Sequence, residues 1–359
     1  MHAPAGDGNG NAVFNVSRDE LKRIVEAAIN DSLSDVSVDG QEPINGFKGY
    51  AAEKALPIIA YRTTGGSSGR ITLFAKHICE GPQYRFLIRH GIPVPRIHGI
   101  VNLAKDDEVI FMERLTAIGI DENDPAEVRQ YIGVLAMINA IRPLPDEPWQ
   151  PPPHAAARCL SNGEWIPKVL KIVWQHAHNG ELGDEIGSLC SDSSSQLDEA
   201  CRKSIAVGKL LEQGPRAVLY EDYGERNTGW RNGDDGRREF VTFDVHRLSQ
   251  GPRFWDFSAV AGEQEGASFK VVSWEERVDY YLEMLARHGG PRATIADFEC
   301  EQKLIRVAAA FDSLYWQAGK SISGEVDWTN DREEGRRTYR GWLLGNLQRI
   351  LAFRVGDCN

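Results

Sequence analysis

The stretch from residue 218 to residue 256 constrains the fold most. Two apolar, strand-like segments in it flank the turn sequence Asn-Gly-Asp-Asp-Gly, which begins at Asn232. Such a turn between two strands predicts an antiparallel hairpin, in which the numbers of facing residues add to a constant. Asn227 opens the first segment and Asp244 ends the second, and a turn centred at 235.5 makes them partners, since 227 and 244 add to 471. Their Cβ atoms are then roughly 5 Å apart.

This pairing predicts a metal site. An amide oxygen beside a carboxylate suits a hard divalent cation such as Mg²⁺, which takes a few protein oxygens and otherwise water and phosphate. A third oxygen-bearing side chain, Asp222, precedes Asn227 by five residues on the loop that leads into the hairpin. The alternative is a hairpin with a solvated acidic rim, because Asp and Asn are common turn residues for local reasons.

One carboxylate that accepts a hydroxyl proton, together with Asn and Asp on Mg²⁺, is the active-site set of the protein-kinase-like phosphotransferases. The stretch resembles the aminoglycoside phosphotransferase and choline kinase family, whose segment reads His-Gly-Asp, then Asn five residues later, then an apolar strand that ends in Asp. The resemblance implies that Asp222 is the catalytic base and that Asn227 and Asp244 are the metal ligands. It makes Asp256 a structural residue near the site, although Asp256 is equally placed to cap a helix.

The sequence departs from the family pattern directly before Asp222. Tyr220 and Glu221 stand where the family has His-Gly. The family's His holds the catalytic loop, so its replacement raises a question about the geometry of that loop more than about its chemistry.

The N-terminal part predicts a helix followed by strands. Ser17 and Glu20 form a capping box, and apolar residues then recur at helical spacing over residues 17 to 33. Strand-like segments follow near residues 46 to 50, 56 to 62 and 71 to 75, and the Gly/Ser-rich segment 64 to 69 connects the last two.

The third strand ends in Lys76, at the place where kinases hold ATP phosphates with a lysine. In the resembled family a glutamate orients this lysine, and Glu80 opens a predicted helix over residues 80 to 90, which ends at Gly91-Ile92-Pro93-Val94-Pro95 as helices of the family commonly do. The spacing of four residues between Lys76 and Glu80 is shorter than usual. The alternative for Lys76 is a strand-end lysine that faces water.

Two further segments are candidates for nucleotide binding. Gly46 and Gly49 lie in a candidate phosphate-covering loop, which lacks a full Gly-x-Gly-x-x-Gly and is equally an ordinary turn. A predicted strand pair over residues 97 to 103 and 108 to 115 ends at Met112, Glu113 and Arg114. These residues resemble the family's hinge, where backbone groups pair with adenine, and an edge strand is the alternative.

The remainder is predicted to be mainly helical. Helices are expected over 126–141, 165–178, 197–212, 257–265, 273–288, 296–318 and 333–353, with a polar loop over 180–195. Two sets of side chains are candidates for an acceptor pocket: the acids Asp297, Glu299, Asp312, Asp327 and Asp331, and the aromatic residues Trp316, Trp328, Tyr339 and Trp342. Solvated helix faces and helix cores explain the same residues.

Composition narrows the class of protein. A net charge of −11 without a run of Lys or Arg argues against a nucleic-acid partner. The six cysteines are scattered without a Cys-x-x-Cys pair, so neither a zinc site nor a disulfide framework is expected. Neither a signal-peptide pattern nor an apolar stretch of ~20 residues occurs, which favours a cytoplasmic protein with no membrane partner.

These observations together predict an α+β, two-lobed protein-kinase-like fold. We expect a disordered tail over residues 1 to 16, a small antiparallel-sheet N-lobe over 17 to 116 and a larger helical C-lobe over 117 to 359. The expected activity is ATP-dependent transfer of a phosphoryl group to a hydroxyl of a small molecule, such as an antibiotic, sugar, nucleoside or metabolite, by a monomer or homodimer. ATP (or another nucleoside triphosphate) and Mg²⁺ are the implied cofactors.

Two other classes of function stay open. A pseudokinase or nucleotide-binding module without transfer activity fits Tyr220-Glu221 and the short spacing from Lys76 to Glu80. A protein kinase fits less well, because the sequence has no His-Arg-Asp, Asp-Phe-Gly and Ala-Pro-Glu set.

Overall fold

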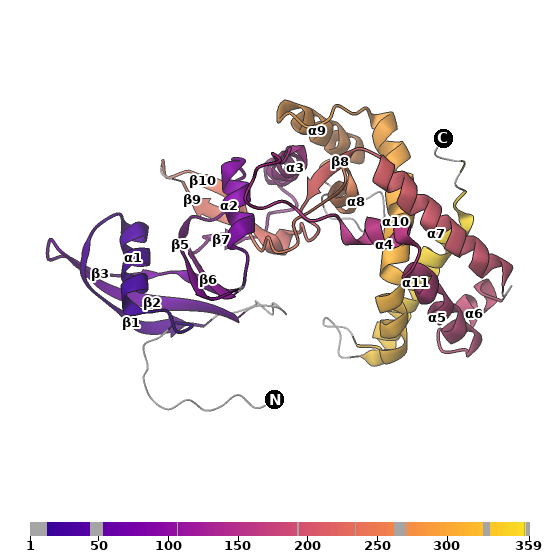
Figure 1. Cartoon of the computed structure of the whole chain (residues 1–359), viewed down its shortest axis with the longest axis horizontal. Coiled ribbons are helices and arrows are strands. Elements are labelled where there is room, and N and C mark those ends of the chain that lie inside the picture. The colour runs from indigo at the N-terminus through magenta and orange to yellow at the C-terminus, as the bar shows by residue number, and fades with distance from the viewer. Residues whose placement is uncertain are drawn as a thin grey trace. The chain divides into compact units, whose positions relative to one another are not determined.

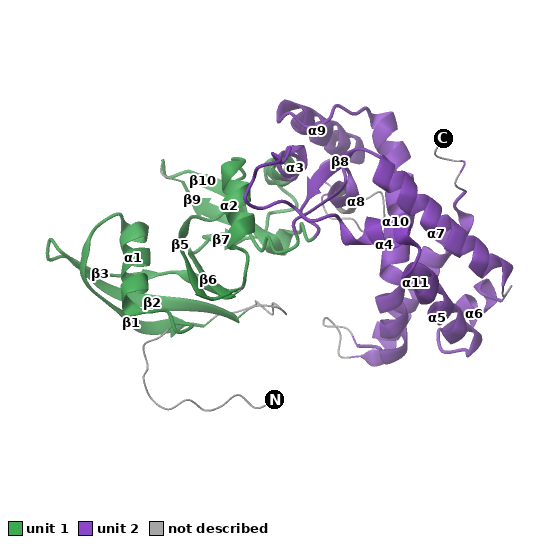
Figure 2. Ribbon diagram, viewed as in Figure 1, with its two compact units in different colours: residues 1–134, 222–247 green, residues 135–221, 248–359 purple. Residues whose placement is uncertain are grey.

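The structure, a computed structural model, describes residues 13–43, 53–105, 107–191, 194–233, 235–261, 269, 271–325, 331–354 and 356. The chain forms two compact units (Figure 2). Unit 1 comprises residues 1–134 and 222–247, and unit 2 comprises residues 135–221 and 248–359. The predicted class is confirmed: an antiparallel sheet forms the N-terminal part, and unit 2 is mostly helical. The predicted lobe boundary at residue 116 stays a prediction.

A six-stranded antiparallel sheet is the centre of unit 1 (Figure 1). Its strands lie in the order β1-β2-β4-β6-β5, and β3 pairs with β2. The strands are β1 (Leu33–Glu42), β2 (Glu53–Thr63), β3 (Ser68–Thr72), β4 (Phe74–His77), β5 (Ile97–Ala104) and β6 (Asp107–Met112). We did not predict β1, because the helix was expected to run to residue 33, whereas it ends at the left-handed C-cap Asn30.

One face of this sheet packs on a helix. The helix α1 (Arg18–Ile29) begins with the predicted capping box, and its buried residues Leu21, Ile24 and Val25 share a core with the sheet residues Ala55, Ala75 and Phe111. Val13 and Val16 are buried in the same core. The prediction of a disordered tail to residue 16 is therefore wrong for residues 13 to 16, and residues 1 to 12 lie outside the described part.

A smaller sheet of unit 1 carries the hairpin. It has the order β10-β9-β7, from β7 (Ala117–Ile118), β9 (Thr228–Asn232) and β10 (Arg238–Thr242), and the short helix η1 (Glu225–Asn227) precedes β9. Unit 1 also contains α2 (Gly81–Arg89) and the beginning of α3 (Pro125–Ala140).

The hairpin register differs from the predicted register by one residue. Thr228 faces Thr242, so the facing numbers add to 470 and not to 471. The reason is the turn: the Gly233 N–H donates to the Arg237 carbonyl over 2.7 Å, which centres the turn at residue 235. Asn227 therefore faces Phe243, whose N–H donates to the Asn227 carbonyl over 2.9 Å, and Asp244 lies one residue further along.

Unit 2 is built from helices around the long pair α10 (Ile295–Ser323) and α11 (Arg332–Ala352) (Figure 1). The other helices are α4 (Ala155–Asn162), α5 (Ile166–His178), α6 (Asp184–Leu189), α7 (Ser195–Gln213), α8 (Trp255–Ala261) and α9 (Trp274–Arg287). We predicted neither α4 nor α6, nor the strands β8 (Arg216–Leu219) and β11 (Ser249–Pro252), which pair antiparallel. In the described part of the chain, every helix is too short or too polar to cross a membrane.

Candidate active site

Lys76 is the centre of a charged cluster in unit 1. It lies on β4 with only 3% of its surface exposed. Its Nζ atom is 2.6 Å from Glu80 Oε1 and 2.7 Å from Asp244 Oδ1. A buried ammonium needs such partners, because leaving water without them costs several kcal/mol. In the structure Lys76 is thus an internal cation, and the alternative of a strand-end lysine that faces water is wrong.

The local sequence explains how Lys76 and Glu80 meet. Side chains of a strand alternate between its faces, and Ala75 points into the core with α1, so Lys76 points to the opposite face. Glu80 is the residue before α2 and is fully buried. Burial raises its pKa, and the charge of Lys76 acts in the opposite direction. The short spacing of four residues is therefore compatible with a direct ion pair.

Asp244 links the hairpin to this cluster. Its Oδ1 atom accepts from Lys76 Nζ and lies 2.9 Å from Nδ1 of His246. Burial acts to raise the pKa of Asp244, but the hydrogen bond with His246 and the charge of Lys76 outweigh it and hold this pKa below its usual value. The Asp244 N–H donates to the Tyr84 hydroxyl over 3.2 Å, and its φ of +68° is in the left-handed region, which Asp tolerates better than most residues.

Asp222 and Asn227 form the second part of the site. Asn227 is buried, and its Nδ2 donates to the Asp222 carbonyl over 2.8 Å and to Asp222 Oδ2 over 3.0 Å. Asp222 Oδ1 accepts from Nη2 of the exposed Arg226 over 2.6 Å. The five-residue spacing from Asp222 to Asn227 thus closes a local turn, which fixes the orientation of both side chains.

The oxygens left over fit a hard cation. Because Asn227 Nδ2 is used by Asp222, its Oδ1 atom faces another way, and no described residue donates to it. Likewise no hydrogen bond from the described residues reaches Asp244 Oδ2. One carboxylate oxygen and one amide oxygen are the donor types that Mg²⁺ takes from proteins. The predicted ligands Asn227 and Asp244 are therefore chemically suited to it, although they are not the facing pair that we expected.

In unit 2, Asp256 holds the backbone that leads to Asp222. Its carboxylate accepts the N–H groups of Tyr220 over 2.6 Å and Glu221 over 3.0 Å. Asn139 Nδ2 donates to the Val218 carbonyl over 2.7 Å and to Asp256 over 3.3 Å. Burial raises the pKa of Asp256 to about 6, against the effect of these hydrogen bonds. The geometry thus supports the predicted structural role of Asp256, and Asn139 belongs to the same network.

Glu221 explains part of the departure from the family pattern. Its φ is +63°, in the left-handed region where glycine is favoured and most other residues are strained. The resembled family has glycine at this position. Here a glutamate adopts the left-handed conformation, and its N–H donates to Asp256 Oδ1. The loop therefore keeps a defined path without the His-Gly sequence.

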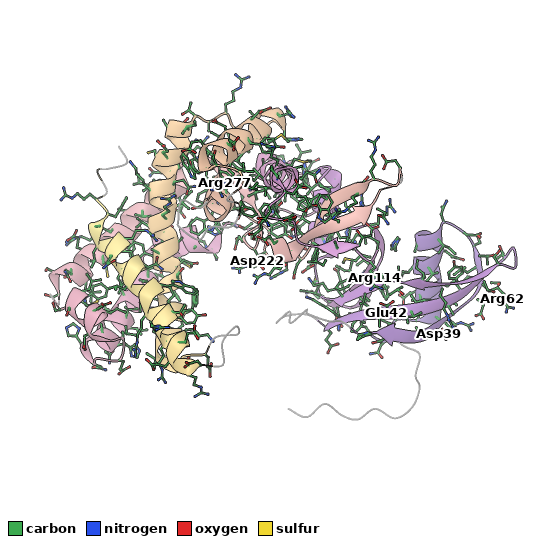
Figure 3. All side chains as sticks on the ribbon, turned by 180° about the vertical axis from the view of Figure 1, so that it is seen from behind. Asp39, Glu42, Arg62, Arg114, Asp222 and Arg277 are labelled. Atoms are coloured by element: carbon green, nitrogen blue, oxygen red, sulfur yellow. The ribbon has the colours of Figure 1, made fainter. Side chains whose placement is uncertain are left out.

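Of the residues predicted to bind the nucleotide in the hinge and in the phosphate-covering loop, the structure describes those of the hinge only. Met112 is buried at the end of β6, the Glu113 N–H donates to the Arg96 carbonyl over 3.0 Å, and Arg114 pairs with Glu42 over 2.5 Å (Figure 3). The Glu113 N–H is thus occupied, and pairing of this segment with adenine stays a prediction. Gly46 and Gly49 lie outside the described residues.

Some of the candidates for an acceptor pocket have a structural explanation, some form an aromatic cluster, and others lie outside the described residues. Asp297 and Asp331 hydrogen-bond the backbone at the starts of α10 and α11, which is a structural explanation for both. Trp316, Tyr339 and Trp342 form an aromatic cluster with ring centroids 5.1 to 6.5 Å apart. Trp328 and Asp327 lie outside the described residues.

Three residues near the charged cluster were not predicted as site residues: His246, Tyr84 and Lys54. Single atoms of His246 and of the predicted Asp244 and Glu80 lie within 4.8 Å of one another, and the Tyr84 hydroxyl accepts the Asp244 N–H. Neither His246 nor Tyr84 carries a signal in the sequence that separates it from an ordinary histidine or core tyrosine. Lys54 on β2 does carry such a signal. A turn centred at Gly65 makes residues 54 and 76 partners in an antiparallel pair, since 54 and 76 add to twice 65.

Comparison with known proteins gives matches in structure only. No family model and no curated protein matches the sequence. Among solved structures, an ethanolamine kinase from Plasmodium vivax matches with 11% identity and a TM-score of 0.49, covering 86% of this chain and 81% of that chain. A putative fructosamine-3-kinase from Haemophilus somnus matches with 12% identity and a TM-score of 0.48, covering 92% and 97%.

A spectinomycin phosphotransferase, solved with ADP and spectinomycin, matches with 11% identity and a TM-score of 0.46, covering 94% of this chain and 98% of that chain. These are small-molecule kinases and phosphotransferases, the kinds of protein that the sequence resemblance predicts. The TM-scores of all three are below 0.5.

Proposed function

We propose that the protein is an ATP-dependent O-phosphotransferase that acts on a hydroxyl of a small molecule. The observation that carries the proposal is the buried Lys76 ammonium, held by Glu80 at 2.6 Å and by Asp244 at 2.7 Å. A buried ion pair of this kind is weak evidence for stability alone, because an apolar replacement is often as stable. A lysine held in place on a strand is, however, the group that phosphoryl transfer needs for orienting phosphates.

The negative charge of the phosphates needs compensation by groups of the site. Asn227 Oδ1 and Asp244 Oδ2 are the oxygens that would hold Mg²⁺, which supplies neutralisation of the phosphate oxygens when bound. Lys76 binds phosphate oxygens from its position on β4, and Glu80 keeps its ammonium aimed at them. Such catalysis consists mostly of positioning and charge stabilisation, so these few groups suffice.

In this proposal Asp222 is the base that accepts the proton of the acceptor hydroxyl. The Oδ2 atom of Asp222 accepts from Asn227 Nδ2 over 3.0 Å, and the Oδ1 atom of Asp222 is paired with Arg226, whose side chain is 76% exposed. An exposed ion pair contributes little free energy, so an acceptor hydroxyl can take the place of Arg226 at Oδ1. Asp222 then orients the hydroxyl and accepts its proton as the phosphoryl group is transferred.

The test is Asp222→Asn. Because the amide keeps the size of the side chain but accepts a proton poorly, we expect turnover to fall by about 10² to 10⁴ while nucleotide affinity stays the same. The measurements are ADP release with Mg²⁺ and ATP, and calorimetric titration with ATP. The acceptor panel begins with ethanolamine, spectinomycin and sugar amines, which are related to the compounds in the names of the similar structures, and continues with nucleosides and other hydroxylated antibiotics.

The matched control is Asp235→Asn, because Asp235 is an exposed acid in the turn of the same hairpin. Its activity should equal that of the unaltered protein. Full activity of Asp222→Asn would refute the assigned base. Nucleotide binding without a phosphorylated product for any acceptor would instead indicate a pseudokinase, the alternative that Tyr220 and Glu221 keep open.

A further inference from the structure

A second lysine lies on the same face of the sheet as Lys76. In the antiparallel pairing of β2 with β4, Lys54 is directly opposite Lys76. Directly opposite residues point to the same face, with Cβ atoms about 4.5 to 5.5 Å apart. The neighbouring pair Ala55 and Ala75 points into the core with α1. Both lysines therefore point away from α1, toward the side of the sheet where Glu80 and Asp244 lie.

The charges around Lys54 are those of the candidate site. Its partial burial lowers its pKa, the carboxylates of Asp244 and Glu80 raise it, and the ammonium of Lys76 lowers it. Both carboxylates also contact Lys76, at 2.6 and 2.7 Å. The face thus has two ammonium groups and two carboxylates. The two ammonium groups repel each other, and an anionic ligand that binds both of them lowers this repulsion.

From this juxtaposition we infer that Lys54 is a second phosphate-binding residue, which together with Lys76 binds the polyphosphate of a nucleoside triphosphate. The inference rests on the proposed function, since it concerns the same nucleotide. A lysine ammonium is a compact point charge with three donors, suited to phosphate oxygens. Two such groups on facing strands can both contact the oxygens of one polyphosphate, whereas a nucleoside without phosphates offers neither of them an anion.

The test compares Lys54→Ala and Lys54→Arg with the unaltered full-length chain. The measured quantities are the dissociation constants of ATP, of adenosine and of inorganic tripolyphosphate, each by calorimetric titration. We expect Lys54→Ala to weaken the binding of ATP and tripolyphosphate by about tenfold or more, because a charged hydrogen bond is lost. Adenosine affinity should stay the same, and Lys54→Arg should restore most of the phosphate affinity.

Lys22→Ala is the matched control, since Lys22 lies on α1 and is paired only over 4.0 Å with Glu26. It should change none of the three constants. Thermal unfolding of each variant shows whether the fold is retained. If Lys54→Ala unfolds, Lys54→Met carries the test, because methionine keeps much of the aliphatic stem and lacks the charge: it should weaken the binding of ATP and tripolyphosphate about as much, with adenosine affinity unchanged.

Each other result has one meaning. Equal ATP affinity of Lys54→Ala and the unaltered chain would overturn the inference and leave the proposed function standing. An equal loss for ATP and adenosine would also overturn it, because it indicates a structural role. Binding of tripolyphosphate that depends on Lys54, in a chain that binds no ATP, would support the phosphate role and refute the proposed function. A chain that binds neither compound would overturn both.

Discussion

The charged cluster around Lys76 and the network around Asp256 hold two parts of the molecule by different means. Lys76, Glu80 and Asp244 are held by ion pairs between side chains, and the cluster keeps polar atoms without protein partners, since Glu80 Oε2 is buried and accepts no hydrogen bond from the described residues. Asp256 instead accepts two backbone N–H groups and one side-chain amide.

This contrast separates a region that can bind ligands, the cluster around Lys76, from a region that fixes the backbone, the network around Asp256. An ion-pair cluster with unused oxygens can exchange partners when a cation or a phosphate arrives, because its charges are compensated but its coordination is incomplete. A carboxylate that accepts hydrogen bonds from the backbone is fixed in place, and these bonds stabilise one conformation of the loop. Substitutions in the two regions should therefore differ in their effects on activity and on stability.

Lys76→Met has the largest expected effect. It leaves Glu80 and Asp244 without their shared cation, so we expect loss of activity by about 10³-fold or more and a decrease of about 3 to 5 kcal/mol in the free energy of unfolding. The decrease should be larger at pH 8 than at pH 5, because burial raises the pKa of Glu80 and a protonated Glu80 needs no cation. Urea unfolding at both pH values measures it.

Lys22, whose side chain is 38% exposed, provides the control, and Lys22→Met should leave activity and stability unchanged. An unfolding free energy of Lys76→Met that equals that of the unaltered protein at both pH values would contradict the view of Lys76 as a buried partner of two carboxylates.

Asp256→Asn has an intermediate effect on stability. The amide retains one acceptor oxygen for two N–H groups, so we expect a decrease of about 1 to 3 kcal/mol in the free energy of unfolding at pH 7. Burial raises the pKa of Asp256 from its ordinary value of 3.8 to about 6. Between about pH 4 and pH 6 the folded protein then binds a proton that the unfolded chain has released, so this residue's contribution to stability falls as the pH rises.

Because Asn does not titrate, the difference in stability between the unaltered protein and Asp256→Asn should be larger at pH 4.5 than at pH 7. Urea unfolding at a series of pH values measures this difference. A constant difference over the whole series would mean that Asp256 does not titrate between about pH 4 and pH 6. The surroundings of Asp256 would then be polar enough to cancel the effect of burial on its pKa.

The smallest effect is expected for Glu221. The variants Glu221→Gly and Glu221→Ala both remove the carboxylate, but only glycine adopts a φ of +63° without strain. We expect Glu221→Gly to be more stable than Glu221→Ala by about 1 kcal/mol, with activity close to that of the unaltered protein. Thermal unfolding and ADP release measure this, and equal stability of the two variants would show that the backbone is not left-handed at this position.

Two pairs of the predicted site residues are close in the sequence. The five residues from Asp222 to Asn227 and the four from Lys76 to Glu80 are short enough that the chain itself brings each pair together, and the structure places both pairs in direct contact. The contact of Lys76 with Asp244 spans 168 residues. Only the resemblance to a known family assigned both residues to one site, and it did not predict their direct contact.

What the sequence did not predict depends on small differences in free energy or on distant neighbours. One hydrogen bond from Gly233 to Arg237 decides the hairpin register, and a turn signal alone does not fix it. The helix α6 is only six residues long and lies in a polar segment, so its helical pattern is too short to recognise. His246 becomes notable only because Asp244 and Glu80 lie beside it in three dimensions.

The division of the chain into units has a consequence for dissecting the protein. The backbone passes from one unit to the other after residues 134, 221 and 247, so that neither unit is one continuous segment. A fragment that stops before residue 222 retains Lys76 and Glu80 but lacks Asp244, the second anion that compensates the lysine. Expression of the N-terminal half as an independent module should therefore yield an incomplete fold, and a gene fusion or circular permutation that preserves unit 1 must keep the segment 222–247 together with it.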